Sequence, residues 1–244
     1  MANAGSVGII EVIDGFYTPT VGDAGAGVAW ATSEDAGNTA WVRAVNATVG
    51  LHATSATDAT DDDMIELCAD NLDTSGQQGY AMFEALLQFD VADTIAINFG
   101  FNDDSLDASN SLPAELATAT WTTNAATFVG LVYDVDATND DWHCMWVDAD
   151  VDATNALADL RMAGSTLVAA KWIQLRVELF DRGSGNGVKA VFHVAQEGKT
   201  FTKEFNTTVN RATALCPYFG YENRAAAAHV CILKYVKRAW SIAD

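Results

Sequence analysis

Two acidic runs have the oxygen-rich spacing that a hard cation such as calcium prefers. Asp134–Asp141 alternates aspartate with smaller residues at its start, and Asp61–Asp63 places three carboxylates in succession. An EF-hand is excluded, because the first run has no glycine at its sixth position and has Met145 where the bidentate glutamate should stand. A calcium site of another kind in either Asp-rich loop is the alternative. We prefer solvated turn residues, and expect no cofactor.

The other side chains with catalytic potential lack the spacing that catalysis requires. The four histidines have no His-x-x-x-His pair, and the chain contains no Gly-x-Ser-x-Gly motif. A zinc site and a serine hydrolase are therefore not predicted. The histidines are His52, His143, His193 and His229.

Seven tryptophans offer flat rings on which the apolar face of a sugar could stack. Most of them are expected in the core or at an interface. Trp121 and Trp142 adjoin predicted loops, and they are the two candidate glycan contacts.

The four cysteines, scattered among apolar neighbours, include no Cys-x-x-Cys pair. We expect buried, reduced thiols that act as small hydrophobic residues. Cys216 and Cys231 flank a predicted turn in consecutive strands, and a disulfide between them is the alternative.

The secondary-structure elements that must position these residues are most clearly predicted in the last third of the chain. In Trp172–Phe180 apolar and polar residues alternate, which is the period of a strand with one wet face. The glycine-rich turn 182–187 then suits a hairpin to Val188–Ala195, and Leu215–Trp240 supplies further strands. The pattern predicts a β-sandwich or barrel.

The rest of the chain reads as further strands with little helix. Phe83–Phe89 and Ile95–Phe101 are separated by a short loop, which predicts antiparallel neighbours. Phe128–Val135 and Trp142–Asp148 form another predicted hairpin. Pro113–Leu116 suits a single helical turn, and Asn155–Met162 a short helix with Asn155 as its cap. The longest irregular stretch is Asn102–Asn124, and a long loop in a compact domain often carries function.

Composition limits the number of domains and the classes of partner that the chain can have. The 244 residues are 50% hydrophobic and contain no linker-like tract, so we expect one domain over residues 28–244, preceded by an arm or edge strand over residues 1–27. The net charge of −20 argues against nucleic acid and anionic membranes as partners. No stretch resembles a membrane span or a secretory signal, which indicates synthesis in a cytoplasm.

One family resemblance follows from these elements in order. The strand Trp172-Ile173-Gln174-Leu175-Arg176-Val177-Glu178, followed by the segment from Pro217-Tyr218-Phe219-Gly220 to Trp240, resembles the concanavalin A-like lectin and glucanase (laminin-G-like) jelly roll. More narrowly, it is similar to the form found in virion proteins of tailed bacteriophages. The resemblance covers roughly Val28 to Trp240. It implies an all-β jelly-roll sandwich of two antiparallel sheets, with at most one or two short helices.

The same resemblance bears on activity. The enzymes of the family use a Glu-x-Asp-x-(x)-Glu strand, in which alternation points the carboxylates into a sugar groove. This chain contains no Glu-x-Asp, and its Glu84 and Glu178 are interpreted as residues of a solvated face. The chain is therefore predicted not to be an enzyme.

Two functions follow as the main hypotheses, and a third is a divergent glycoside hydrolase or lyase, which would need acids brought together from separate strands. The first is a virion structural protein of a tailed phage, either a capsid decoration protein or a head or tail appendage. Its partners would be the major capsid protein or other virion proteins, and it would form a homo-oligomer such as a trimer. The alternative is a carbohydrate-binding module or adhesin that recognises a host glycan.

Overall fold

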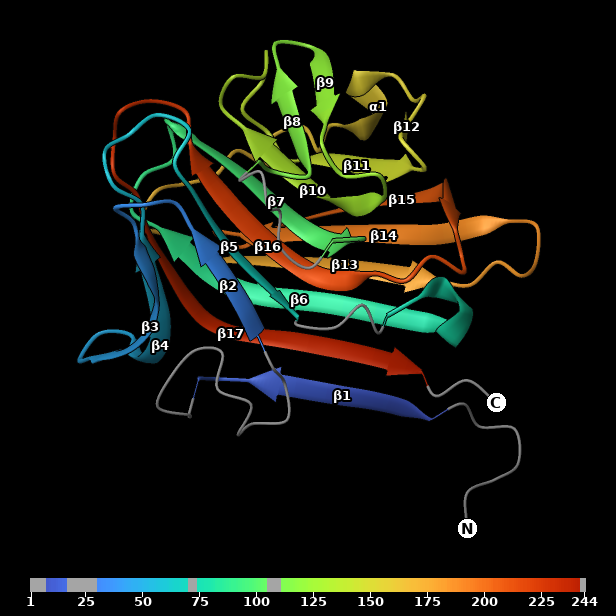
Figure 1. Cartoon of the computed structure of the whole chain (residues 1–244), viewed down its shortest axis with the longest axis horizontal. Coiled ribbons are helices and arrows are strands. Elements are labelled where there is room, and N and C mark those ends of the chain that lie inside the picture. Colours follow the sequence, from blue (N-terminus) through green and yellow to red (C-terminus); the bar gives the residue numbers. More distant parts are fainter. Residues whose placement is uncertain (1–7, 17–29, 70–73, 105–110, 242–244) are drawn as a thin grey trace.

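The computed structural model describes residues 8–16, 30–69, 74–104 and 111–241. Within these ranges the strands form two large antiparallel sheets, of eight and seven strands, and one separate two-stranded hairpin (Figure 1). The fold is a lectin-like jelly-roll sandwich, as the family resemblance implies. The only α-helix in the described ranges is α1 (Leu157–Leu160), and no described helix is long and apolar enough to cross a membrane.

The eight-stranded sheet has the order β15-β14-β13-β6-β17-β4-β3, with β1 also paired to β17. Its strands are β1 (Ile9–Asp14), β3 (Thr39–Asn46), β4 (Gly50–Ala56), β6 (Tyr80–Phe89), β13 (Ile173–Phe180), β14 (Gly187–Gln196), β15 (Lys199–Asn210) and β17 (Val230–Ser241).

The seven-stranded sheet has the order β12-β11-β10-β7-β16-β5-β2. Its strands are β2 (Trp30–Glu34), β5 (Met64–Ala69), β7 (Ile95–Asn102), β10 (Phe128–Asp134), β11 (His143–Asp148), β12 (Val151–Asp152) and β16 (Cys216–Asn223). The separate hairpin consists of β8 (Ala114–Ala117) and β9 (Thr120–Thr123).

Local alternation and turn chemistry explain the hairpins that the sequence predicts. In β13 the odd-numbered residues are buried and the even-numbered ones are partly exposed, so Ile173–Phe180 presents one face to the core. Positive backbone φ angles at Gly183 and Gly185 allow the turn to β14. A second tight turn with positive φ at Glu197 and Gly198 then leads into β15, a strand that the sequence analysis did not assign.

The predicted pairing of Phe83–Phe89 with Ile95–Phe101 is wrong. These strands are β6 and β7, and they belong to opposite sheets: β6 pairs with β13 and β17, whereas β7 pairs with β10 and β16. The short loop between them crosses from one sheet to the other. Their apolar faces therefore meet across the core, and the rings of Phe83 and Phe99 stack at 4.4 Å between centroids.

The helical predictions are only partly confirmed. Pro113–Leu116 does not form a helical turn, because Ala114–Ala117 is strand β8 and pairs with β9. The short helix predicted over Asn155–Met162 is present as the four residues of α1, but its N-cap is Ala156 rather than Asn155.

The disulfide alternative for Cys216 and Cys231 is also wrong, since both thiols are free and buried. They lie in different sheets, Cys216 at the start of β16 and Cys231 near the start of β17. The remainder of β16 separates Cys216 from the turn that leads to β17, and seven residues of strand span roughly 23 Å.

The first strand, β1, lies along the C-terminal half of β17 as an edge strand. Asp14, at the end of β1, is buried, and its Oδ2 accepts a hydrogen bond of 3.1 Å from the indole nitrogen of Trp30. The segment Ile9–Asp14 is thus joined to the sandwich. The remainder of the predicted arm, residues 1–7 and 17–27, lies outside the described residues, and the division at residue 27 stays a prediction.

The hairpin of β8 and β9 covers the outer face of the seven-stranded sheet (Figure 1). The amide of Asn98, on this face of β7, donates to the backbone oxygen of Ala114 at 2.8 Å and accepts from its nitrogen at 2.9 Å. Leu112 packs there with Met64 and Ala96. The outer face of this sheet is consequently buried in the region of the hairpin, whereas the outer face of the eight-stranded sheet keeps many partly exposed side chains.

Candidate functional site

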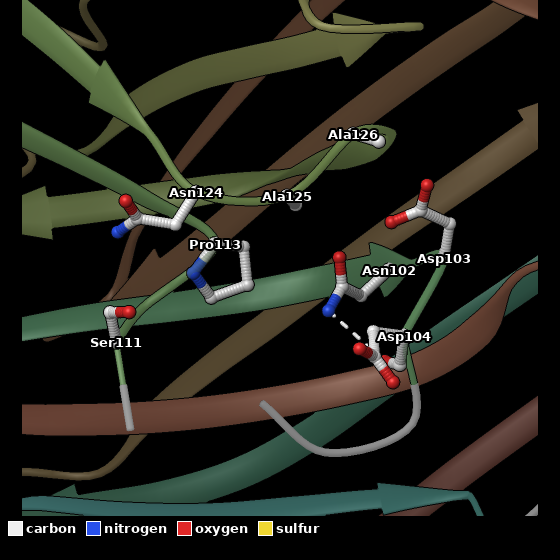
Figure 2. A pocket seen from close by; sticks show the side chains of 8 residues that line it. All are labelled: Asn102, Asp103, Asp104, Ser111, Pro113, Asn124, Ala125 and Ala126. Carbon is white, nitrogen blue, oxygen red and sulfur yellow. Dashed lines mark hydrogen bonds between the residues drawn. The ribbon is translucent and has the colours of Figure 1, made fainter. Parts of the chain in front are cut away.

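A polar pocket of about 300 Å³ lies where β7 ends, beside the connections that enter β8 and leave β9 (Figure 2). The first connection contributes Asp103 and Asp104 directly after the buried strand β7, and the second contributes Asn124 directly after β9. The lining residues are Asn102, Asp103, Asp104, Ser111, Pro113, Asn124, Ala125 and Ala126. We call this site the Asn102 pocket.

Backbone hydrogen bonds hold the Asn102 pocket in shape. The nitrogens of Asn124 and Ala125 both donate to the oxygen of Pro113, at 3.0 and 3.2 Å, and the nitrogen of Asp103 donates to the oxygen of Thr127 at 3.0 Å. The side-chain amide of Asn124 donates to the oxygen of Leu112 at 2.9 Å. The connections that form the walls are therefore tied to each other and to the start of β10.

The side chain of Asn102 is 2% exposed, and only half of its amide is satisfied. Its nitrogen donates to the backbone oxygen of Asp104 at 3.0 Å, whereas its buried oxygen Oδ1 has no hydrogen-bond partner. Figure 2 shows this oxygen turned away from Asp104. A buried acceptor without a partner destabilises the fold by about 1–3 kcal/mol. A ligand that donates a hydrogen bond to this oxygen would remove that penalty.

The pocket presents mainly acceptors. Beside the oxygen of Asn102 stand the carboxylates of Asp103 and Asp104. Burial raises the pKa of Asp103 above its usual value, and hydrogen bonds from Thr127 oppose that effect. Such a set accepts hydrogen bonds from hydroxyl groups and repels anions. The same oxygens are of the type that calcium takes, but the described residues contain no group of three or more His, Cys, Asp or Glu side chains able to hold a metal ion.

The two tryptophans proposed from sequence lie apart from this pocket's lining. Trp142 is 0% exposed and packs against Tyr133 at 5.4 Å between ring centroids, so its ring offers no face to a ligand. Trp121, on β9, is partly buried and meets the ring of His143 edge to face at 6.1 Å. Trp121 helps to hold the hairpin on the sheet, and the role of either ring as a glycan contact has only the sequence behind it.

The acidic run Asp134–Asp141 is held by arginines. The carboxylate of Asp134 is buried and bound by Arg224, with Nη2 at 2.8 Å from Oδ2 and Nε at 3.2 Å from Oδ1. Asp141, at the other end of the run, is bound by Arg161 at 2.6 Å. Both carboxylates are therefore neutralised by guanidinium groups from other parts of the chain.

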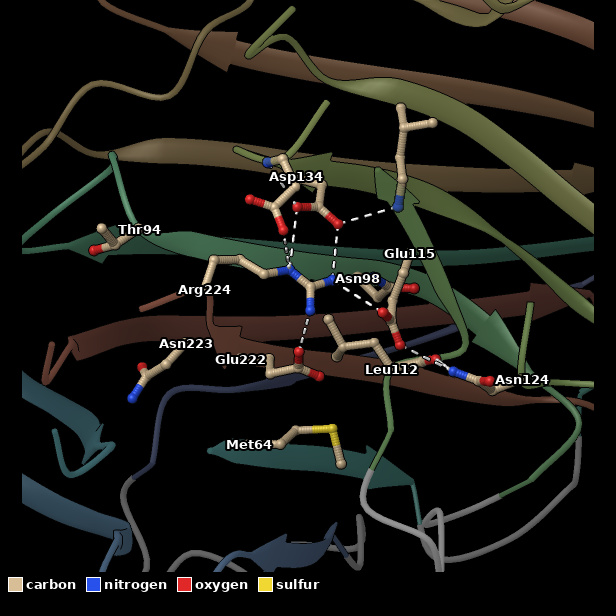
Figure 3. A network of polar contacts seen from close by, with 12 residues as sticks. Met64, Thr94, Asn98, Leu112, Glu115, Asn124, Asp134, Glu222, Asn223 and Arg224 are labelled. Carbon is tan, nitrogen blue, oxygen red and sulfur yellow. Dashed lines mark hydrogen bonds and ion pairs between the residues drawn. The ribbon is translucent and has the colours of Figure 1, made fainter. Parts of the chain in front are cut away.

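Arg224 is the centre of a larger buried network (Figure 3). Its Nη2 also lies 3.4 Å from a carboxylate oxygen of Glu115, and its Nη1 donates to Glu222. Its Nε also lies 4.0 Å from a carboxylate oxygen of Asp136, so one guanidinium contacts four carboxyl groups. Burial raises the pKa of Glu222 to about 8, although the positive charge of Arg224 opposes this effect. This network joins β8, β10 and β16 and has a structural role.

The other acidic run, Asp61–Asp63, is mainly exposed, but Asp63 is buried. Burial, followed by the hydrogen bond to Asp58, raises the pKa of Asp63 to about 6. The carboxyl groups of Asp58 and Asp63 share a hydrogen bond, which lowers the pKa of Asp58. A proton shared between them limits the negative charge that this loop offers to a cation at mildly acidic pH.

Glu84 and Glu178 lie on the outer face of the eight-stranded sheet, where each is more buried and better paired than a solvated residue. Glu178 accepts from Tyr80 at 2.9 Å and meets His193 at 2.8 Å, and Glu84 accepts from Tyr235 at 2.8 Å. The hydrogen bond with His193, assisted by Tyr80, lowers the pKa of Glu178 despite its burial. A general acid needs a raised pKa, so Glu178 is unsuited to that role at neutral pH.

Sequence reasoning does not single out the residues of the Asn102 pocket, although it identifies Asn102–Asn124 as a long loop of the kind that often carries function. The available signal is the polar run Asn102-Asp103-Asp104 directly after the apolar strand β7. The partners of that run come from beyond β9, which the sequence analysis did not assign as a strand.

Solved structures with the same architecture can now be compared. A protein of unknown function from Shewanella oneidensis MR-1 aligns with a TM-score of 0.64 at 8% identity, over 98% of this chain and 89% of that one. The carbohydrate recognition domain of Emp47p aligns with a TM-score of 0.56 at 13% identity, over 93% of each chain. Peanut lectin aligns with a TM-score of 0.56 at 11% identity, over 96% of this chain and 98% of the lectin. The fold is of the legume-lectin type.

An enzyme shares this architecture as well. Alginate lyase vAL-1 from Chlorella virus aligns with a TM-score of 0.50 at 10% identity, over 89% of this chain and 95% of the lyase. At such identities the likeness establishes the fold alone. No protein-family model and no curated protein sequence matches the chain. The narrower resemblance to tailed-phage virion proteins stays a prediction.

Proposed function

We propose that this chain is a carbohydrate-binding protein without catalytic activity, and that a neutral sugar occupies the Asn102 pocket. The observation that carries the proposal is the buried, unpartnered oxygen of Asn102 beside two aspartates in a preformed polar pocket. The hydroxyl groups of a sugar are donors that suit these acceptors. The lectin-type architecture, shared with peanut lectin and the Emp47p domain, supports the proposal at the level of the fold.

The electrostatics of the pocket favour a neutral ligand. Asp103 and Asp104 are adjacent acids in the lining of the pocket, so a carboxylated or sulfated sugar would be repelled from this site. A hydrogen bond to a charged group contributes about 1.5–3 kcal/mol, and two or three of them suffice for weak, selective binding. The virion location, capsid partner and oligomeric state predicted from sequence stay predictions, on which this proposal does not depend.

The test is a titration of the full chain with a panel of neutral mono- and oligosaccharides, monitored by NMR. The affinity of the best ligand is then measured by calorimetry. Asp103→Asn keeps the shape of the side chain and removes its charge. We expect this variant to bind roughly tenfold more weakly, because it loses a charge-assisted hydrogen bond. Asn102→Leu removes the unpartnered acceptor and is expected to abolish measurable binding.

The matched control is Asp61→Asn, which removes one charge from an exposed site outside the pocket. It should leave the dissociation constant unchanged, and urea unfolding of each variant should show that all of them are folded. Equal affinity in wild type and Asp103→Asn would refute the pocket assignment. Release of reducing ends from any polysaccharide in the same panel would refute the non-enzymatic part of the proposal.

A further inference from the structure

A second cavity, of about 510 Å³, opens on the eight-stranded sheet where β17 changes partners. Residues Val230–Leu233 of β17 pair with β4, and Val236–Ser241 pair with β1, on the same side of the strand (Figure 1). Lys234 and Tyr235 fall between these two partners. The result is a notch in the sheet, which we call the Lys234 notch.

A β-bulge directs side chains into the Lys234 notch. The register between β17 and β6 shifts between Leu233 and Tyr235, so Lys234 is the extra residue. Bulges of this kind re-aim a side chain beside a site. Lys234, Tyr235 and Lys237 line the cavity together with Glu84, Leu51 and Ile13.

Among the residues that the structure describes, no carboxylate forms an ion pair with the ammonium group of Lys234. It donates to the backbone oxygens of Val49 at 2.7 Å and Leu51 at 2.8 Å, which leaves one of its three donors free. These partners are neutral carbonyls, in a chain that has only 13 basic residues against 33 acidic ones. The positive charge of Lys234 is therefore positioned in advance and left for an anion.

The acids around the notch already have cations of their own. Glu84 lies 3.8 Å from Arg176, and it also accepts a hydrogen bond from Tyr235. Lys237 pairs at 2.8 Å with Glu11 of β1, whose side chain is 48% exposed. An entering anion meets no unpaired carboxylate among these groups. It can also draw Lys237 away from Glu11, because an ion pair with one solvent-exposed partner is weak.

We propose that the Lys234 notch binds a carboxylate-bearing sugar, such as a uronic acid residue. Lys234 and Lys237 would hold the carboxylate, while Leu51, Ile13 and the ring of Tyr235 would contact the apolar face of the sugar ring. The hydroxyls would bond to Glu84 and to the phenol of Tyr235. This site is independent of the Asn102 pocket and requires a ligand of the opposite electrostatic type.

The experiment is a titration of the full chain, labelled with ¹⁵N, with glucuronate and in parallel with glucose. Glucuronate is expected to shift the backbone resonances of Lys234 and Tyr235 with a dissociation constant on the order of millimolar, as is usual for one sugar unit. Glucose should bind at least roughly tenfold more weakly, since it lacks the charge. Raising the salt from about 0.05 to about 0.5 M should weaken the binding of glucuronate.

Lys234→Gln tests the assignment, with Lys189→Gln as the matched control. Lys189 lies on the same sheet face but pairs with Glu204, outside the notch. Lys234→Gln should weaken glucuronate binding roughly tenfold, and Lys189→Gln should leave it unchanged. Should Lys234→Gln unfold, Lys237→Gln makes the same test.

Four results would overturn the inference. Equal affinity for glucose and glucuronate would remove the role of charge, and unchanged binding in both notch variants would place the ligand elsewhere. Displacement of glucuronate by inorganic phosphate at equal concentration would show a simple anion site, which contradicts a sugar ligand. Loss of binding in Asp103→Asn but not in Lys234→Gln would assign glucuronate to the Asn102 pocket instead.

Discussion

Glu222 gives the most quantitative test of the buried network around Arg224. Its side chain is buried and accepts a hydrogen bond from Arg224, so Glu222→Gln keeps the shape and the contact while it removes the titration. The wild-type carboxyl has a pKa of about 8 in the folded chain against an ordinary value of 4.5. The folded state therefore binds the proton more tightly than the unfolded state does.

The sign of the effect follows from that difference. Protonated Glu222 stabilises the fold fully below pH 4.5, and this contribution is lost as the pH rises through the folded pKa of about 8. Between about pH 5.5 and about pH 8.5, linkage predicts that wild type loses roughly 3 kcal/mol of unfolding free energy relative to Glu222→Gln. For a chain of this length that corresponds to a relative fall of about 6–12 °C in Tm.

Urea unfolding followed by tryptophan fluorescence, at a series of pH values for both proteins, measures this difference. Other titrating groups are common to both proteins and cancel. Glu34→Gln serves as control because Glu34 is exposed at the end of β2, and its curve should run parallel to wild type. Parallel curves for Glu222→Gln would refute the reasoning, since they would mean that Arg224 keeps Glu222 ionised throughout.

Three further outcomes follow from buried groups. Arg224→Met leaves the carboxylate of Asp134, 1% exposed, without its cation, and we expect urea unfolding to show a loss of about 3–5 kcal/mol that Asp134→Asn partly restores. Trp142→Ala should lower the unfolding free energy by about 3–5 kcal/mol without changing sugar affinity of the folded protein, because the ring is buried outside both cavities. Burial lowers the pKa of His143 to about 4, so stability should fall as the pH drops from 6.5 towards 4, and His143→Gln should flatten that part of the pH curve.

The sequence predicts the architecture well wherever the decisive information is local. Alternation in Trp172–Phe180 and the glycines of the following turn determine β13, β14 and the hairpin between them. The same alternation misleads at β6 and β7. A short loop between two alternating segments fits a hairpin within one sheet and a crossing between two sheets equally well, and only the distant partners β10, β13, β16 and β17 decide between them.

The candidate sites depend even more on distant residues. Asp134 has the spacing of a cation ligand, but its cation is Arg224, 90 positions away. The sequence predicts Trp142 as a glycan contact because it adjoins a predicted loop, but its ring is buried in the core against Tyr133. The Lys234 notch arises from a change of strand partners, which leaves no pattern in the sequence. Local patterns therefore show which side chains could bind a cation or a sugar. Tertiary contacts determine whether those side chains are accessible to a ligand.

The pairing of β1 with β17 has a consequence for biosynthesis. Ile9–Asp14 leaves the ribosome long before its partner Val236–Ser241. Until that segment emerges, β6 lacks its neighbour β17, and Ile9, Ile10 and Ile13 stand without a sheet. Long-range β pairing of this kind is slow and exposes strand edges. A nascent chain shortened before residue 236 would therefore present two open edges to the chaperones and proteases of the cell.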